Sequence, residues 1–219
     1  MSALRELYDY DRLRRIELPT IFRVQVGNSV VVLGGSQSVS VLDLVFLGEQ
    51  NLRRRRGGGG LVLLSNADLI VDWWIPTGDS RWSSDVRESS RLVGRWWAEV
   101  LRDFVDDDVT IHDAGLEGDR DFRVVCFAGR GPGEVFVAGK KAVGLTQWRV
   151  REGVFVSTVV HASSSLQVLP FLRSVPEGIE PSLDHHTLAS LGISDLHDVA
   201  RRLRDASGLS SVVRVDLDN

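Results

Sequence analysis

The sequence predicts one α/β domain of the α+β type, in which a mostly antiparallel mixed sheet is packed with helices and followed by a short helical C-terminal tail. Two patterns lead to this prediction. Short apolar runs rich in valine, isoleucine and leucine recur along the chain, as is typical of strands. From Val86 to Phe104 the apolar residues instead repeat with a period of about 3.6 residues, which indicates an amphipathic helix.

The first half of the chain is predicted to consist mainly of strands. Its apolar runs are broken by Gly27-Asn28 and Gly34-Gly35 and end at Pro76, residues that commonly end strands. Ser83 or Ser84 is the expected N-cap of the helix that follows. The strands are expected over Ile21–Val26, Ser29–Leu33, Val39–Leu47, Gly60–Leu64 and Leu69–Ile75.

The second half is predicted as an antiparallel meander that leads into the tail. Its strands are expected over Val109–His112, Phe122–Phe127, Glu134–Val137, Ala142–Val150 and Gly153–His161. They are followed by a short helix at Leu166–Leu172, a turn at Pro176–Pro181, a helix from Ser194 to Asp205 and a strand at Val212–Val215. No linker divides the 219 residues, so we predict a single domain with a core at residues 18–175 and a tail at residues 176–219.

Composition and charge exclude several classes of protein. The chain carries 26 basic and 30 acidic residues, a formal charge of −4, which argues against a general nucleic-acid binder. No apolar run approaches the roughly 20 residues that span a bilayer, and the N-terminal stretch lacks the apolar part of a signal peptide. A single cysteine allows neither an internal disulfide nor a cysteine-ligated zinc site, and we assign no metal ligands. We therefore expect a cytoplasmic protein with no nucleic-acid or membrane partner.

Four consecutive arginines, Arg53–Arg56, are followed directly by four glycines, Gly57–Gly60. Glycines allow backbone N–H groups to approach a ligand closely, and guanidinium groups form charge-assisted hydrogen bonds with phosphate or carboxylate. We interpret the segment as an anion-binding loop, the alternative being a solvated surface loop. It matches neither the Walker A motif nor the Rossmann fingerprint.

The only two lysines, Lys140 and Lys141, are adjacent and lie at a predicted hairpin tip. A solvated turn is one explanation of such a pair. Strand alternation, however, places Lys141 on the same face as Val143, so the sheet can direct this lysine toward a pocket. Gly144 would allow close approach of the backbone there.

These two segments, in this order, resemble the motifs of the lipoate–protein ligase family. The family carries R-R-x-[ST]-G-G-G-A-V, and residues 53–61 read R-R-R-R-G-G-G-G-L. It also carries G-[KR]-K-[ILV]-x-G-[ST]-[AQ]-Q, and residues 139–147 read G-K-K-A-V-G-L-T-Q. Leu33–Gln37 and Arg151–Val154 resemble two flanking motifs of the family, and the similarity extends over about residues 18–161.

The resemblance implies a biotin/lipoate ligase-like catalytic domain. Such enzymes activate lipoate or octanoate with ATP and Mg²⁺ as an acyl-adenylate and transfer the acyl group to a lysine of a lipoyl carrier domain. Lys141 matches the family lysine that holds the reacting carboxylate and phosphate. The chain could also need a separate accessory subunit. The residues implied in acyl-adenylate binding are Arg53, Arg54, Gly57, Gly58, Gly59, Gly144 and Gln147.

Two alternatives remain open. Related octanoyltransferases use a cysteine nucleophile without ATP, and Cys126 precedes Lys141 by 141 − 126 = 15 positions. A neighbouring lysine could lower the pKa of this thiol, although Cys126 could equally be a core residue of a buried strand. The other alternative is a non-catalytic protein that binds lipoate or an acyl-adenylate. It is favoured because Leu63-Leu64 and Val156-Ser157 replace the family's His-Asp and His-Gly pairs.

Overall fold

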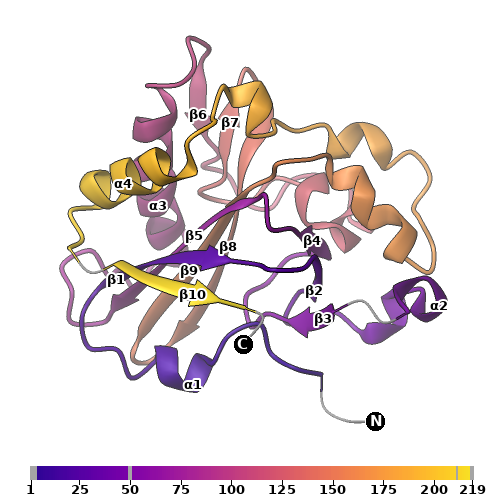
Figure 1. The fold of residues 1–219 in the computed structure, drawn as a ribbon, viewed down its shortest axis with the longest axis horizontal. Helices are drawn as coiled ribbons and strands as arrows, with labels where there is room; N and C mark the ends of the chain where they lie inside the picture. The colour runs from indigo at the N-terminus through magenta and orange to yellow at the C-terminus, as the bar shows by residue number, and fades with distance from the viewer. Residues whose placement is uncertain (1–3, 49–50, 211, 218–219) are drawn as a thin grey trace.

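The computed structural model describes residues 4–48, 51–210 and 212–217, and its strands form two sheets (Figure 1). The large sheet has seven strands in the order β10-β1-β5-β9-β8-β7-β6. Neighbouring strands in this sheet are antiparallel, except that β10 pairs in parallel with β1 at the edge. The strands are β1 (Thr20–Gln25), β5 (Leu69–Pro76), β6 (Val109–Ile111), β7 (Val135–Val137), β8 (Lys140–Val150), β9 (Gly153–Val160) and β10 (Val212–Asp216).

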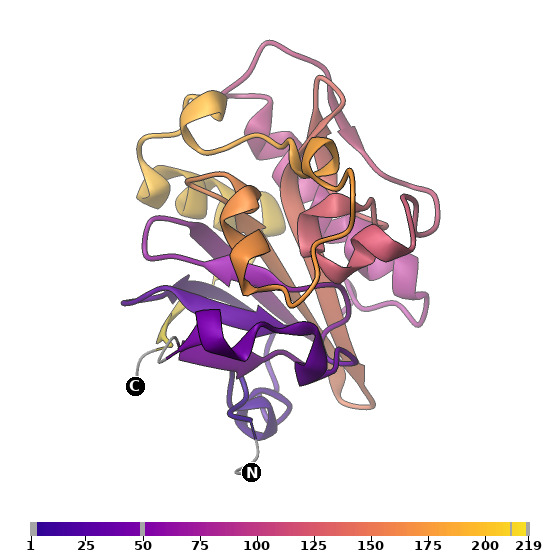
Figure 2. The same cartoon turned by 90° about the vertical axis from the view of Figure 1, so that its right-hand side faces the viewer.

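The small sheet has three strands in the order β3-β2-β4. They are β2 (Val30–Leu33), β3 (Asn51–Arg54) and β4 (Val62–Leu64). The glycine run lies between β3 and β4, so the small sheet fixes both of its ends. In the view of Figure 2, the small sheet lies beside the 3₁₀ segment Ser165–Phe171, which contacts β4.

Two α-helices of more than one turn occur in the described ranges: α3 (Val86–Leu101) and α4 (Leu196–Ser207). The carboxylate of Asp85 caps α3 by accepting a hydrogen bond from the Arg87 N–H at 2.7 Å, so the expected Ser83 or Ser84 cap is wrong. Neither helix is long and apolar enough to cross a membrane, and the same holds for every other helix of the described residues. The shorter segments are α1 (Tyr10–Leu13), α2 (Leu44–Leu47) and the 3₁₀ turns η1 (Val39–Val41), η2 (Asp121–Val124), η3 (Cys126–Ala128), η4 (Ser165–Phe171), η5 (Glu180–Leu183) and η6 (Ala189–Leu191).

The large sheet is covered on both faces. Adjacent residues of β5 point to opposite faces, yet Trp73 and Trp74 are both fully buried. Trp73 packs in the core formed with α3 and α4, whereas Trp74 packs in the core formed with the small sheet. The sheet is therefore the middle layer of the domain.

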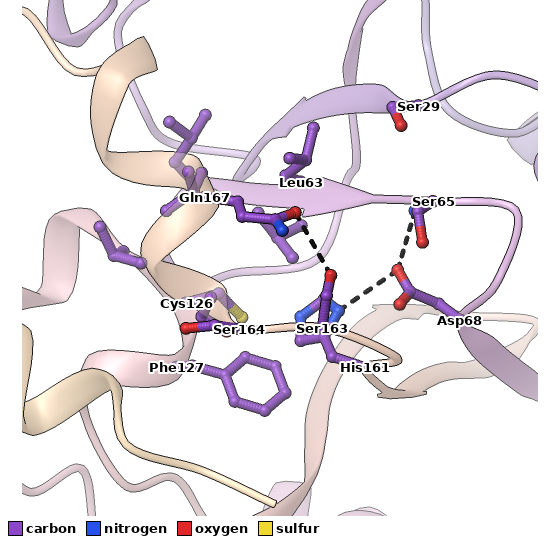
Figure 3. A pocket seen from close by; sticks show the side chains of 15 residues that line it. Ser29, Leu63, Ser65, Asp68, Cys126, Phe127, His161, Ser163, Ser164 and Gln167 are labelled. Carbon is purple, nitrogen blue, oxygen red and sulfur yellow. Dashed lines mark hydrogen bonds and ion pairs between the residues drawn. The ribbon is translucent and has the colours of Figure 1, made fainter. Parts of the chain in front are cut away.

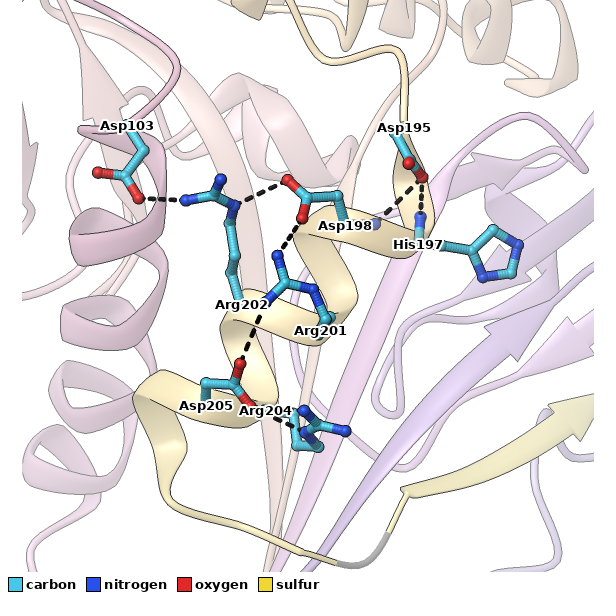
Figure 4. A network of polar contacts seen from close by, with 8 residues as sticks. All are labelled: Asp103, Asp195, His197, Asp198, Arg201, Arg202, Arg204 and Asp205. Atoms are coloured by element: carbon cyan, nitrogen blue, oxygen red, sulfur yellow. Dashed lines mark hydrogen bonds and ion pairs between the residues drawn. The ribbon is translucent and has the colours of Figure 1, made fainter.

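An ion pair joins α4 to the end of α3 (Figure 4). Arg202 on α4 forms ion pairs with Asp198 one turn earlier, at 2.8 Å, and with Asp103 just beyond the end of α3, at 2.6 Å. Asp195 caps α4, and Gly208 ends it in a left-handed conformation with φ 64°. These contacts hold the C-terminal segment against the domain, and β10 then completes the edge of the large sheet.

Two predicted strands are wrong. Val39–Leu47 forms η1 and α2 because Ser38 and Asp43 act as side-chain caps: the Asp43 carboxylate accepts hydrogen bonds from the Val45 and Phe46 N–H groups. The expected strand at Phe122–Phe127 is replaced by η2 and η3. Its residues form a single isolated bridge in the described ranges, between Val125 and Leu61, which precedes β4.

Candidate functional site

A groove of about 940 Å³ runs past the glycine loop, and we call it the glycine groove. It lies between the small sheet, the start of α3 and the chain that connects β6 to β7. Backbone atoms of glycines and charged side chains of both signs line the groove. Its main walls are Gly58–Gly60, Ser84–Arg87, Gly115–Glu117, Gly129–Pro132 and Leu145–Gln147.

Tight backbone packing explains most of the glycine run. A Cβ atom at Gly57 would lie 2.6 Å from Oγ1 of Thr146, and one at Gly60 would lie 2.5 Å from the Arg123 carbonyl oxygen. Gly59 has φ +88°, which favours glycine. Gly58 alone has no atom within 4 Å of a Cβ position, so a ligand has room to approach the backbone there.

Arg54 and Arg55, which precede the glycine run, form hydrogen bonds with backbone carbonyl oxygens in and around the loop. Nη1 of Arg54 donates hydrogen bonds to the carbonyl oxygens of Gly34 and Gln37 at 3.0 and 2.6 Å. Arg55 is buried and donates to the carbonyl oxygens of Gly58 and Gly60 at 2.8 and 2.7 Å. In this structure the guanidinium groups of these two residues therefore bond to the protein's own carbonyl groups.

The remaining two arginines of the run are also placed away from the groove. Arg56 forms an ion pair with Glu6 at 2.7 Å and lies over the ring of Tyr10 at 4.9 Å. Arg53 is buried on β3. Among the described residues, the arginines that line the groove are instead Arg87, Arg123 and Arg130. Arg123 and Arg130 also donate to the carbonyl oxygens of Gly118 and Gly139. Sequence reasoning missed these three arginines because each stands alone in the chain, outside any motif.

Lys141 is buried on β8 and is held by protein groups. Its Nζ lies 2.8 Å from Oε2 of Glu134 and also donates to the carbonyl oxygen of Gly129. Glu134 lines the glycine groove, whereas Lys141 lines a neighbouring depression together with Lys140. Lys140 is exposed and pairs with Asp184 at 2.7 Å.

A small apolar cavity of about 50 Å³ lies between the two sheets. Gly144 lines it, and a Cβ atom there would lie 2.6 Å from the ring of Phe127, so this position has no room for a side chain. Leu145 and Thr146 of β8 line both this cavity and the glycine groove, which places the two spaces side by side. The apolar wall consists of Leu7, Val32, Val62, Leu64, Ile70 and Val159.

A buried carboxyl group lies behind the apolar cavity. Asp72 is fully buried on β5, and its Oδ2 accepts a hydrogen bond of 2.5 Å from the hydroxyl of Tyr8, which lines the cavity. The backbone N–H of Thr158 donates to the other oxygen at 3.1 Å. Burial raises the pKa of Asp72 to about 7, because these hydrogen bonds offset only part of the loss of solvation.

Cys126 lies where three spaces meet. It is half-buried at the start of η3, and its N–H donates to the Leu61 carbonyl oxygen at 2.9 Å, which holds it beside the glycine loop. It lines the glycine groove, the apolar cavity and a third cavity that we call the histidine cavity (Figure 3). Asp68, Phe127 and His161 also line the histidine cavity.

The fold therefore brings only some of the sequence-predicted site residues together. Gly58, Gly59 and Gln147 line the groove, and Cys126 joins it to the apolar cavity that Gly144 lines. Nε2 of Gln147 donates to the Val86 carbonyl oxygen and to Oγ of Ser90, at 2.7 and 2.9 Å. No group of three or more histidine, cysteine, aspartate or glutamate side chains within the described ranges has the arrangement of a metal site. The predicted residues that line neither the groove nor the apolar cavity are Arg53, Arg54, Gly57 and Lys141.

The fold matches solved structures of lipoate ligases. Lipoate-protein ligase A bound with ATP superposes with a TM-score of 0.71 at 15% identity, over 96% of this chain and 82% of the other. A bi-partite lipoate protein ligase with its E2 lipoyl domain, from Thermoplasma acidophilum, gives 0.71 at 14% identity over 95% and 80%. Protein Ta0514 from T. acidophilum, with bound lipoic acid, gives 0.70 at 14% identity over 98% and 89%.

These similarities define the class of fold. No family model matches the sequence, and no curated protein matches it. At 14–15% identity the superpositions establish a shared fold. The chain has the biotin/lipoate ligase-like catalytic-domain fold, so the expected fold class is confirmed, and the resemblance found in the motifs is supported at the level of the fold.

Proposed function

We propose that this protein carries out lipoate ligase-like acyl transfer. Lipoate or octanoate would be activated by ATP as an acyl-adenylate and then attached to a lysine of a lipoyl carrier domain. The observation that carries this proposal is the junction of the glycine groove and the apolar cavity at Leu145 and Thr146. The cavity of about 50 Å³ would have to widen to admit an acyl chain, whose carboxyl group would then lie beside the glycine loop.

The groove offers the groups that a nucleotide needs. The backbone at Gly58 is open to a ligand, and Arg87, Arg123 and Arg130 can neutralise phosphate charge. Positioning and charge neutralisation account for most of the catalysis in attack at a phosphorus centre. Mg²⁺ would neutralise further phosphate charge, and Asp85 and Glu117 supply carboxylate oxygens of the kind that Mg²⁺ prefers.

Lys141 can act in this reaction only if its ammonium group leaves Glu134. To hold the carboxylate and the phosphate, its ammonium group would exchange Glu134 for substrate oxygens. Glu134 already lines the groove, so only this one carboxylate has to be displaced. We therefore keep Lys141 as the proposed catalytic lysine and Glu134 as the group that competes with the substrate for it.

The contents of the similar structures support the ligands and partners. They hold ATP, lipoic acid or an E2 lipoyl domain, and one is described as bi-partite. A lipoyl carrier domain is accordingly the proposed acceptor, and a separate accessory subunit a proposed partner. We propose that the reaction takes place in the cytoplasm.

The test is the intact mass of an unmodified lipoyl carrier domain incubated with this protein, Mg²⁺ and lipoate or octanoate, with and without ATP. An acyl mass that appears only with ATP supports the proposal. The double variant Glu134→Gln/Lys141→Met, which leaves no unpaired buried charge, should then abolish the product while remaining folded, whereas Lys140→Met, the control at the adjacent exposed position, should keep it. If the folded protein binds octanoate but adds no mass with ATP, the ligase proposal fails and the non-catalytic binding protein replaces it.

A further inference from the structure

A basic depression of about 300 Å³ lies at the β10 edge of the large sheet, and we call it the arginine depression. It is formed by α4 and the strands β1 and β10, and its lining shares no residue with that of the glycine groove. Among the described residues, no aspartate or glutamate lines it. The basic residues that line it are Arg23, His197, Arg201, Arg204 and Arg214. The ligase reaction proposed above uses none of these side chains.

Two structural elements bring these charges together. Arg23 on β1 and Arg214 on β10 are register partners in the parallel strand pair, so their side chains lie on the same face of the sheet. The other three basic residues recur every three to four positions along α4 and therefore share one side of that helix. Figure 4 shows His197 and Arg204 on the side of α4 that faces away from α3.

The arginines of the helix side already have carboxylate partners. Arg201 forms an ion pair with Asp205 at 3.4 Å and a second one with Asp198. Arg204 pairs with the other oxygen of Asp205 at 2.7 Å (Figure 4). The positive charge of these two arginines is therefore balanced in large part beside the depression.

The two arginines of the strand side have uncharged acceptors. Nη1 of Arg23 donates a hydrogen bond to the Leu196 carbonyl oxygen at 3.0 Å, and Arg214 donates to Oε1 of Gln25. Burial lowers the pKa of Arg23, the charge of Arg214 lowers it further, and Asp195 acts in the opposite direction without reversing the shift. Like charges opposite each other on neighbouring strands are destabilising. An anion bound between these two guanidinium groups would relieve their repulsion.

The chemistry of the depression suits a phosphate monoester. A guanidinium group has five N–H donors in a planar fork that matches phosphate, and Arg23 uses Nη1 for its bond to Leu196. A phosphate monoester carries a charge of about −1.5 to −2 at neutral pH, close to the charge of the two strand arginines. The volume of about 300 Å³ is at the lower end of the range of small-molecule sites. Val212 and Ala200 offer apolar contact to the rest of such a ligand.

We propose that the arginine depression binds the phosphate group of a small phosphate monoester, with Arg23 and Arg214 as its principal ligands and Arg201 and Arg204 on the opposite side. This site goes beyond the proposed ligase function and does not depend on it. Since its ligands come from α4 and from the β1–β10 pair, a bound phosphate joins the helix to the edge of the sheet. Binding should therefore stabilise the folded protein.

Calorimetry at low ionic strength and about pH 8, where the monoester is a dianion, tests the site with two probes. Inorganic phosphate represents the free ion, and glycerol 3-phosphate represents an ester of a small molecule. Glycerol 3-phosphate should bind more tightly than inorganic phosphate if the apolar contacts contribute, and Arg214→Gln should weaken its binding at least about tenfold. Arg87→Gln is the matched control, because it removes one arginine from the glycine groove, and it should leave the affinity unchanged.

Thermal unfolding separates a lost site from a misfolded variant. Arg214 is exposed, and its replacement by glutamine removes one of two facing charges, so the Tm without ligand should not fall. Glycerol 3-phosphate should raise the Tm of wild type but not that of Arg214→Gln. Tighter binding of inorganic phosphate than of the ester would overturn the monoester proposal and leave a site for the free ion. Absence of binding to folded wild type overturns the site altogether, as does unchanged affinity in Arg214→Gln. Weaker binding in Arg87→Gln alone would place the phosphate in the glycine groove instead.

Discussion

Glu134 and Lys141 form an ion pair of 2.8 Å in which the two side chains are only 5% and 4% exposed. Oε2 of Glu134 also accepts a hydrogen bond from the Gly131 N–H at 2.7 Å. The pair therefore ties the chain before β7 to the start of β8. It also keeps the ammonium group next to the glycine groove but bound to a protein carboxylate.

Removing the lysine should unfold the protein more easily. Lys141→Met leaves the Glu134 charge buried without its partner, and such a loss typically lowers the free energy of unfolding by about 3–5 kcal/mol. The double variant Glu134→Gln/Lys141→Met should lose clearly less, because no unpaired charge remains. Urea unfolding of the two single variants and the double variant measures the coupling. Additive losses would contradict the ion pair.

Removing the carboxylate should strengthen anion binding. Glu134→Gln keeps the size of the side chain but no longer neutralises Lys141, so we expect several-fold tighter binding of ATP, measured by calorimetry. With Mg²⁺ left out of both titrations, so that the proposed Mg²⁺ ligand role of Glu117 does not enter, Glu117→Gln is the control, since it also removes a negative charge that lines the groove but is not paired with Lys141. Equal effects of the two variants would show that only net charge matters.

The glycine run offers a pair of variants that separates packing from ligand approach. Gly57→Ala places a Cβ atom 2.6 Å from Oγ1 of Thr146 and should cost about 1–3 kcal/mol in the free energy of unfolding. Gly58→Ala meets nothing within 4 Å and should change that free energy by less than about 0.5 kcal/mol. If the backbone at Gly58 contacts the nucleotide, Gly58→Ala should nevertheless weaken ATP binding. Unchanged binding would place the nucleotide elsewhere.

Periodicity predicted the elements whose environment is uniform along their length. β5 is buried at every position and α3 has one apolar face, so the apolar pattern of each agrees with its structure. The strand predicted at Val39–Leu47 is wrong because the environment of this segment is not uniform along its length. Val45 is 92% exposed, and its apolar character carries no information about burial. Local capping by Asp43 decides the conformation there.

The sequence predicted the site residues that lie in a continuous motif. It missed those that the fold brings together from separate parts of the chain. Gly58 and Gln147 were found because they lie in motifs, and both line the groove. Arg54 lies in the same motif but bonds to carbonyl oxygens of the turn after β2, a partner that becomes adjacent only when β2 and β3 pair. His161 and Asp68 come from different strand ends, and no spacing in the sequence indicates that they meet.

The buried Asp72 predicts how stability depends on pH. Its pKa is raised by burial from 3.8 to about 7 in the folded protein. Between these two values the folded state holds a proton that the unfolded state has released, so stability falls as pH rises, by at most about 1.4 kcal/mol per unit. Above about pH 7 both states are ionised and this dependence ends.

Asp72→Asn isolates this effect from the other titrating groups, because its side chain stays neutral at every pH. The amide oxygen can still accept from the Thr158 N–H, and the amide NH₂ can donate to the hydroxyl of Tyr8. In urea titrations at pH 5 and pH 8, wild type should lose more stability over this interval than Asp72→Asn. Tyr8→Phe removes a hydrogen bond that lowers the pKa of Asp72, so the loss of stability should continue above pH 7 in that variant. Parallel profiles for wild type and Asp72→Asn would mean that the carboxyl group has an ordinary pKa in the folded protein.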